Sequence, residues 1–238
     1  MLSWLFPSTC ELCGETADLT ICPDCLRKLP RIPVPVCLHC GAPTAGLQVD
    51  ADRCDHCSGH ARPFAMARQA LRQSEEAMQL IYAFKYHGAL HLARPLAGLL
   101  HELWEKTPRL ARHSDWLLVP VPVTLQKLYT RGYNQAGELA RHLATMRGLR
   151  YAELLERRDT GVLSQTRLTA RARRLNAMRA YHLKPPGFFS RHRSFPSRLV
   201  LVDDVFTTGA TARACATQLR KLPGVKEVVS LSLVRIGT

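Results

Sequence analysis

The sequence predicts an α/β fold: a mostly parallel sheet with helices on both faces, preceded by a small zinc-binding module. Two observations lead to this prediction. Beyond residue 60, short apolar runs alternate with segments whose apolar residues have helical spacing, and this alternation is typical of parallel sheets. Before it, eight cysteines form four C-x-x-C pairs, a pattern typical of structural zinc sites.

The composition is that of a folded protein without a membrane span. The chain has 238 residues, of which 46% are apolar, enough for a main domain with a real core and a small module beside it. No apolar run reaches the roughly 18 residues of a membrane helix. The start, MLSWLFPSTC, has no basic region before its apolar residues, so we expect a cytoplasmic location without membrane insertion.

The cysteine pairs predict two tetrahedral Zn²⁺ sites. We expect sequential pairing rather than an interleaved cross-brace, because each site then closes a short loop. The predicted ligands are Cys10, Cys13, Cys22 and Cys25 for one ion and Cys37, Cys40, Cys54 and Cys57 for the other. Disulfides would require an oxidising compartment, a redox site would use a single pair, and an iron–sulfur cluster remains an alternative.

Three further residues bear on this region and on cysteine chemistry. His39 and His56 lie inside the second motif, and we interpret them as surface residues because four sulfurs are already available. The ninth cysteine, Cys215, stands alone in a helical stretch. We interpret it as a small buried apolar residue rather than a nucleophile.

The first half of the main domain predicts two helices, a strand and a third helix. Residues 74–106 have helical spacing, with Ser74 as the expected N-cap and Gly88 dividing the segment. Residues 116–121 form a buried strand, and residues 134–149 form a helix that ends near Gly148. We interpret the segment RPFAMARQA after Cys57 as the passage between module and main domain.

The second half adds a long connection and a strand–helix–strand unit. Residues 198–204 (RLVLVDD) and 227–236 read as buried strands, with a helix over residues 210–222 between them. The stretch 157–197 has weak periodicity and many arginines, and such a long connection is typical of a lid over a binding site. We expect a helical piece around residues 168–179 within it.

Charge is unevenly distributed between the two parts. The chain carries 33 basic and 19 acidic residues. Residues 1–60 hold four basic and seven acidic side chains, so the rest carries a net charge of +17. Such an excess favours polyanions, either nucleic acid or a small molecule with several phosphates, although a solvated basic surface remains the simpler alternative.

The segment LVLVDDVFTTGAT (199–211) predicts a binding site for a phosphorylated ribose. Ligands of open α/β sheets bind at the carboxyl ends of strands, where Asp203 and Asp204 lie. The following loop, Thr207, Thr208, Gly209, Ala210 and Thr211, opens a helix and offers N–H groups and hydroxyls to a phosphate. The two carboxylates would accept hydrogen bonds from ribose hydroxyls or bind Mg²⁺ through water.

This segment resembles the motif with which type I phosphoribosyltransferases bind 5-phosphoribosyl 1-pyrophosphate (PRPP). With the cysteine pairs, FKYHG, VPVPVTLQKLYTRGYNQAGELA and LSQTRLTARARRLNAMRAY, the chain resembles the ComF/GntX family along nearly its whole length. The resemblance implies a double zinc ribbon over residues 1–60. It implies a phosphoribosyltransferase-like, Rossmann-like domain over residues 61–238.

The resemblance also assigns roles to residues. Asp203 and Asp204 would face the ribose hydroxyls and Mg²⁺, and residues 207–211 would hold the 5′-phosphate. The turn at residues 121–124 would lie near the pyrophosphate, with Lys85 and Arg131 as candidates to neutralise it. The arginine-rich stretch, with Gln165, Arg173 and Asn176, would be a mobile loop that closes over the site and excludes water.

Two functions follow from these features, and no catalytic residue or acceptor can be assigned. ComF-like proteins are associated with natural competence, which implies a PRPP-binding protein that handles single-stranded DNA during uptake, with competence-machinery proteins as further partners. Tyr129, Tyr133, Phe188 and Phe189 lie near basic residues and are candidates for stacking on bases. The alternative is a PRPP-dependent phosphoribosyltransferase, an enzyme of the glycosyltransferase class, that acts on a small-molecule acceptor.

Overall fold

The computed structural model describes residues 9–44, 54, 57, 59, 61, 63–158, 179–185 and 196–237. At its centre lies a five-stranded sheet in which all neighbouring strands run parallel. In spatial order the strands are β1 (Met66–Arg72), β7 (Glu227–Arg235), β6 (Arg198–Phe206), β2 (Trp116–Pro120) and β3 (Arg150–Tyr151). The predicted α/β fold with a parallel sheet is confirmed.

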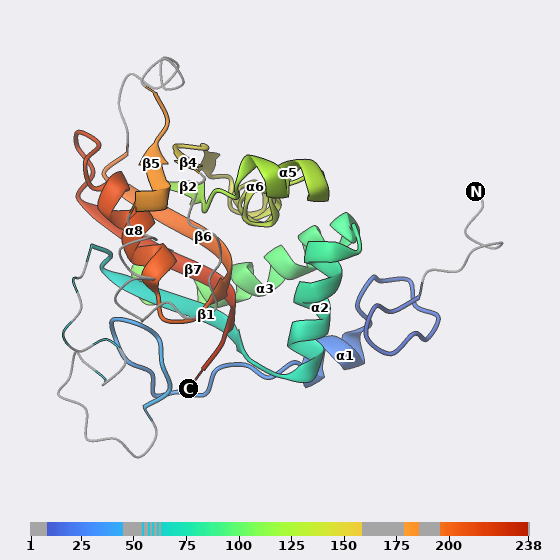
Figure 1. The fold of residues 1–238 in the computed structure, drawn as a ribbon. Coiled ribbons are helices and arrows are strands. Elements are labelled where there is room, and N and C mark those ends of the chain that lie inside the picture. Colours follow the sequence, from blue (N-terminus) through green and yellow to red (C-terminus); the bar gives the residue numbers. More distant parts are fainter. Residues whose placement is uncertain are drawn as a thin grey trace.

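Helices cover both faces of this sheet (Figure 1). On one face α2 (Glu75–Tyr86), α3 (Ala93–Glu105) and α6 (Gln135–Arg147) pack on the sheet in one apolar cluster. The other face is covered by α8 (Ala210–Leu219) and by a two-stranded antiparallel sheet of β4 (Leu155–Arg157) and β5 (Tyr181–Leu183). The central strands are therefore apolar on both faces, as the sequence predicts.

The helix boundaries follow the predicted signals. The Ser74 hydroxyl accepts a hydrogen bond from the Ala77 N–H at 3.2 Å and caps α2. Gly88, with φ +65°, separates α2 from a 3₁₀ turn at Leu90–Leu92 and from α3. Gly148 ends α6 in the left-handed conformation.

Several elements were not predicted. Strand β1 begins within the segment interpreted as the passage between module and main domain, so residues 66–70 of that segment belong to the main sheet. The turn after β2 continues into α5 (Leu125–Arg131), and a short α4 (Pro108–Ala111) follows α3. Strand β6 also runs two residues past the predicted end at Asp204, because β7 pairs with it as far as Phe206.

The long connection 157–197 begins at the last residue of β4 and contains β5. The two strands pair antiparallel, with Arg157 opposite Tyr181. Residues 159–178 and 186–195, which include Gln165, Arg173 and Asn176 and most of the expected helical piece, lie outside the described residues.

The N-terminal region packs against the edge of the main sheet. Its described residues include one short helix, α1 (Pro23–Lys28). Ile21 and Leu29 join the apolar cluster of α2 and α3, and the Ala67 N–H in β1 donates to the carbonyl of His39 at 2.6 Å. The boundary between residues 60 and 61 remains a prediction.

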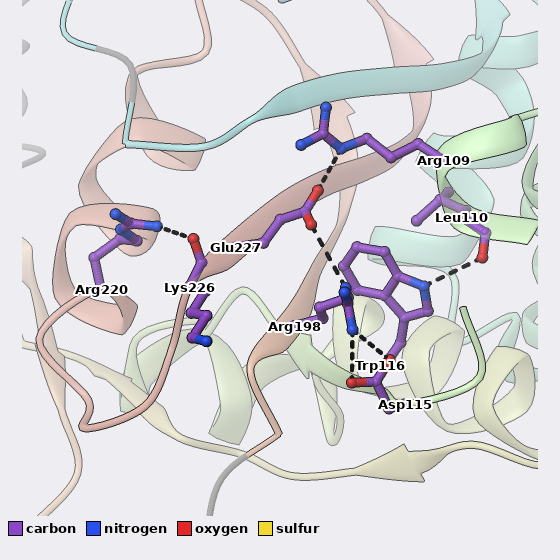
Figure 2. Close-up of polar contacts among 8 residues, drawn as sticks. All are labelled: Arg109, Leu110, Asp115, Trp116, Arg198, Arg220, Lys226 and Glu227. Carbon is purple, nitrogen blue, oxygen red and sulfur yellow. Dashed lines mark hydrogen bonds and ion pairs between the residues drawn. The ribbon is translucent and has the colours of Figure 1, made fainter. Parts of the chain in front are cut away.

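Ion pairs connect the amino ends of the central strands to neighbouring segments (Figure 2). Arg198, at the start of β6, donates to both carboxylate oxygens of Asp115 at 2.9 Å. Glu227, at the start of β7, forms an ion pair with Arg109, and its Oε2 lies 3.8 Å from Nε of Arg198. Part of the basic excess therefore neutralises carboxylates at the edge opposite to Asp203 and Asp204.

Candidate functional site

The two adjacent aspartates of β6 face opposite sides of the sheet, because successive side chains of a strand alternate. Val200 and Val202 lie in the apolar cluster beneath α2 and α6, so Asp204 is on that side. Leu199 and Leu201 lie in the cluster beneath α8, which puts Asp203 on the other side.

Asp204 forms an ion pair with a lysine from α2. The ammonium nitrogen of Lys85 lies 2.8 Å from Asp204 Oδ2, and the two side chains are 21% and 12% exposed. Lys85, predicted as a cation for a pyrophosphate, is therefore at the acid pair and in contact with one of its members.

Asp203 is half-buried on the other side of the sheet. Burial, followed by the charge of Asp204, raises the pKa of Asp203 well above its ordinary value. Its Oδ1 accepts a hydrogen bond from the Asp204 N–H at 2.9 Å. Burial raises the pKa of Tyr181 to about 12, and the charge of Asp203 adds to this rise. Asp203 thus faces the β4–β5 side of the site.

The loop after β6 has the form expected of a phosphate site. Gly209 is the N-cap of α8 and has φ +72°. A Cβ atom at this position would lie 2.7 Å from Cζ of Phe206, which is buried. The first N–H groups of a helix have no partner within the helix, and those of α8 follow two exposed threonines, Thr207 and Thr208. N–H groups and hydroxyls can therefore converge on an anion here.

The turn after β2, which is predicted to lie near a pyrophosphate, lies beside β6. The Val121 N–H donates to the carbonyl of Val202 at 2.9 Å, and the side-chain amide of Asn134 donates to the carbonyl of Val121 at 3.0 Å. Thr124 caps α5 by accepting from the Lys127 N–H at 3.3 Å. The turn is thereby held between β6 and the start of α6.

Cations from three elements influence one another at this edge. Burial lowers the pKa of Lys127, and the positive charges of Arg157, Arg131 and Lys85 lower it further, while Asp204 acts in the opposite direction. Arg131 also donates to Gln135 Oε1 at 3.1 Å. Sequence reasoning selected Lys85 and Arg131 but missed Lys127 and Arg157. Lys127 could have been found from the sequence, because it lies in the segment that leads from the end of a strand into a helix.

A cavity of about 740 Å³ lies beside the turn after β2. Its lining includes Pro122, Val123 and Asn134 from the turn and the start of α6, and Arg157 and Lys184 from the β4–β5 side. The cavity thus shares Arg157 with the group of cations at this edge of the sheet.

The acid pair is where Mg²⁺ is predicted to bind together with PRPP. Within the described ranges, the groupings of three or more cysteine, histidine or carboxylate ligands are the two cysteine groups. Mg²⁺ is usually held by one or two carboxylates together with water and the phosphates of a substrate. Because Asp203 and Asp204 face opposite sides of the sheet and Lys85 contacts Asp204, Mg²⁺ at this site stays a prediction.

The cysteines form the two predicted zinc-binding sites with sequential pairing. Within each group the sulfur atoms lie within 4.8 Å of one another. Tetrahedral zinc with Zn–S bonds of about 2.3 Å separates its sulfurs by roughly 3.8 Å. In the second group the distances include 3.6 Å between Cys37 and Cys57 and 3.8 Å between Cys54 and Cys57.

The three further residues, His39, His56 and Cys215, have different outcomes. His39 is buried at 5% exposure, and its ring stacks on Phe64 with centroids 4.7 Å apart, so its interpretation as a surface residue is wrong. His56 lies outside the described residues. Cys215 is fully buried among apolar side chains, as predicted.

The residues predicted to stack on bases differ in their exposure. Tyr133 donates its hydroxyl to the carbonyl of Phe84 at 2.6 Å and is part of the packing between α2 and α6. Tyr129 is 85% exposed on α5. Tyr82 and Tyr86 on α2, which were not predicted, are also exposed, with ring centroids 5.0 Å apart. Phe188 and Phe189 lie outside the described residues.

No helix in the described part of the chain has the length and apolar character to cross a membrane.

Comparison with known proteins gives matches to both parts of the chain. A family model for the double zinc ribbon domain matches residues 1–59. Competence protein F of Haemophilus influenzae is 30% identical over 218 residues, which is 90% of each chain. Competence protein ComFC of Streptococcus pneumoniae is 25% identical over 95% of this chain and 99% of its own. DNA utilization protein YhgH of Salmonella typhimurium is 28% identical over 90% of this chain and 91% of its own.

Proposed function

Because this chain belongs to the ComF family, we propose that it binds PRPP or a related phosphoribosyl ligand and handles single-stranded DNA during uptake. The names of its relatives, two competence proteins and a DNA utilization protein, support a competence-associated role. The proposal includes a cytoplasmic location, where cysteines stay reduced and available to zinc.

One observation carries the phosphoribosyl part of the proposal. Two carboxylates, a glycine-capped helix start and a group of cations come together at the carboxyl edge of the sheet. The loop of residues 207–211 can take a 5′-phosphate, and the carboxylates can accept hydrogen bonds from the vicinal hydroxyls of ribose. Lys127 and Arg131 are candidates to meet a pyrophosphate on C1.

The surface beside this site supports a contact with single-stranded DNA. Tyr82, Tyr86 and Tyr129 are exposed on α2 and α5, the same helices that carry Lys85, Lys127 and Arg131. Aromatic faces stack on bases, and neighbouring cations pair with the phosphates of the strand. A strand bound here would pass next to the phosphoribosyl site. Proteins of the competence machinery would be further partners.

The second candidate function is a PRPP-dependent phosphoribosyltransferase. Cations of α2, α5 and β4 around the acid pair favour it, because departure of pyrophosphate from C1 places negative charge on the leaving group. The C1–oxygen bond to pyrophosphate would break and a bond from C1 to an acceptor would form. The acceptor is a small molecule that the cavity beside the turn could admit.

The test is calorimetric titration with PRPP and Mg²⁺, in the presence and in the absence of a single-stranded oligonucleotide. Wild-type protein is expected to bind, and the double variant Asp203→Asn, Asp204→Asn to lose binding while its circular dichroism stays unchanged. Asp24→Asn, on the exposed helix α1, is the matched control. Unchanged affinity in the double variant would refute the site.

The oligonucleotide separates the two functions. Affinity for PRPP that changes when DNA is bound would favour the DNA-handling function. PRPP binding indifferent to DNA, followed by release of pyrophosphate with a candidate acceptor, would favour the transferase.

A further inference from the structure

Lys85 is held in place by the packing of α2. Its neighbour Phe84 is fully buried, and the carbonyl of Phe84 accepts the hydrogen bond from the Tyr133 hydroxyl at 2.6 Å. One residue beyond α2, the His87 N–H donates to the carbonyl of Ala83 at 3.1 Å. The last turn of the helix is thus anchored on both sides of Lys85, and its side chain reaches the edge of the sheet.

The ion pair between Lys85 and Asp204 is largely shielded from water. With exposures of 21% and 12%, the ammonium and the carboxylate are screened less than a surface pair, and their attraction is correspondingly larger. The ammonium therefore supplies, within the chain, a positive charge at the acid pair.

The other carboxylate faces the opposite side of the sheet, and its Oδ1 accepts a hydrogen bond from the Asp204 N–H at 2.9 Å. With Asp204 neutralised by Lys85, a phosphate that enters the loop at residues 207–211 meets less negative charge from the pair. Divalent cations commonly provide this compensation where carboxylates and phosphates meet.

From this arrangement we infer that Lys85 takes the place of a divalent cation, so that the site binds a phosphate monoester carrying a vicinal diol, such as ribose 5-phosphate, without metal. The inference rests on the proposed phosphoribosyl site. Under this inference the acid pair needs no metal of its own, and a metal enters only together with a pyrophosphate group. Lys85 then determines which ligands the site accepts.

Ribose 5-phosphate is the probe, because it has the phosphate and the diol but no pyrophosphate. Its affinity is measured by calorimetry with Mg²⁺ and in buffer freed of divalent ions over a resin before the protein is added, so that zinc stays on the cysteines. Wild-type protein is expected to bind equally well in both buffers, within twofold.

The variant Lys85→Met is expected to lose at least tenfold in affinity without Mg²⁺ and to recover most of it with Mg²⁺, which then compensates Asp204. Lys106→Met, which removes an exposed lysine paired with Glu102 on α3, is the matched control and should behave as wild type. The comparison of buffers with wild-type protein needs no variant and holds even if Lys85→Met does not fold.

The outcomes are distinct. Wild-type binding that requires Mg²⁺, or full affinity of folded Lys85→Met without Mg²⁺, would overturn the role of Lys85 and leave the phosphoribosyl site standing. Failure of wild type to bind either PRPP or ribose 5-phosphate in any buffer would refute the site and the role of Lys85 together.

Discussion

Alanine at position 209 should destabilise the protein through two separable effects. The first is the backbone: Gly209 has φ +72°, and an alanine in the left-handed region costs about 1–2 kcal/mol. The second is a steric overlap, since the new Cβ would lie 2.7 Å from Cζ of Phe206. Phe206 is only 4% exposed, and overpacking of this kind costs about 1–3 kcal/mol.

Gly132→Ala isolates the backbone effect. Gly132 has φ +79°, and its Cβ would have no heavy atom within 4 Å. Only the first effect applies there, so the two variants should differ by about 1–3 kcal/mol. At about 2–4 °C per kcal/mol for a protein of this size, Gly209→Ala should melt about 2–12 °C below Gly132→Ala.

The assay is thermal unfolding followed by circular dichroism, on both variants and on Gly209→Ala combined with Phe206→Leu. Leucine lacks the two ring atoms nearest to the new Cβ, so the double variant should lose less stability than the sum of the two single changes. Equal melting temperatures for Gly209→Ala and Gly132→Ala would refute the close approach of the loop to Phe206.

Three further predictions concern charge and metal. Because the folded protein raises the pKa of Asp203, ionisation destabilises the fold as pH rises above the ordinary value of about 3.9. Asp203→Asn should therefore raise the melting temperature more at pH 7.5 than at pH 4.5, and an equal change at both would contradict the shift. Removal of zinc should unfold residues 1–60 and leave residues 61–238 folded, because the apolar cluster at the second zinc site consists of four cysteines and Ala42; limited proteolysis that finds both parts intact would exclude a structural role for zinc. Binding of single-stranded DNA should weaken steeply with salt, by about a thousandfold between 50 and 200 mM if six phosphates are contacted, and a flat response in a filter-binding assay would remove the basic surface from the interface.

Local signals predicted the elements whose boundaries depend on a few neighbouring residues. The hydroxyl of Ser74 and the glycines at 88 and 148 mark helix ends by their own chemistry, and the structure confirms them. The spacing of the cysteines was enough to predict the two zinc sites. The strands β2, β6 and β7 and the helices α6 and α8 were likewise readable, because the strands are apolar on both faces, whereas the short elements α4, α5, β3, β4 and β5 were not predicted.

Strand β1 was missed because its residues carry little strand preference. The segment Met66–Arg72 contains methionine, alanine, glutamine and leucine, which are good helix formers. It is a strand because β7 pairs with it over its whole length. His39 was misjudged for a related reason, since its burial depends on Phe64, which is distant in the sequence.

The sequence sufficed for the composition of the candidate site: the acid pair, the loop that follows it and the eight cysteines are contiguous or regularly spaced, so their chemistry can be inferred locally. Only the tertiary structure decided that Asp203 and Asp204 face opposite sides, that Lys85 contacts Asp204, and that the charges of Asp204 and Arg157 both act on Lys127. These residues come from α2, α5, β4 and β6. Parallel strands and their connections bring them to one edge of the sheet, and no periodicity within a single segment records that convergence.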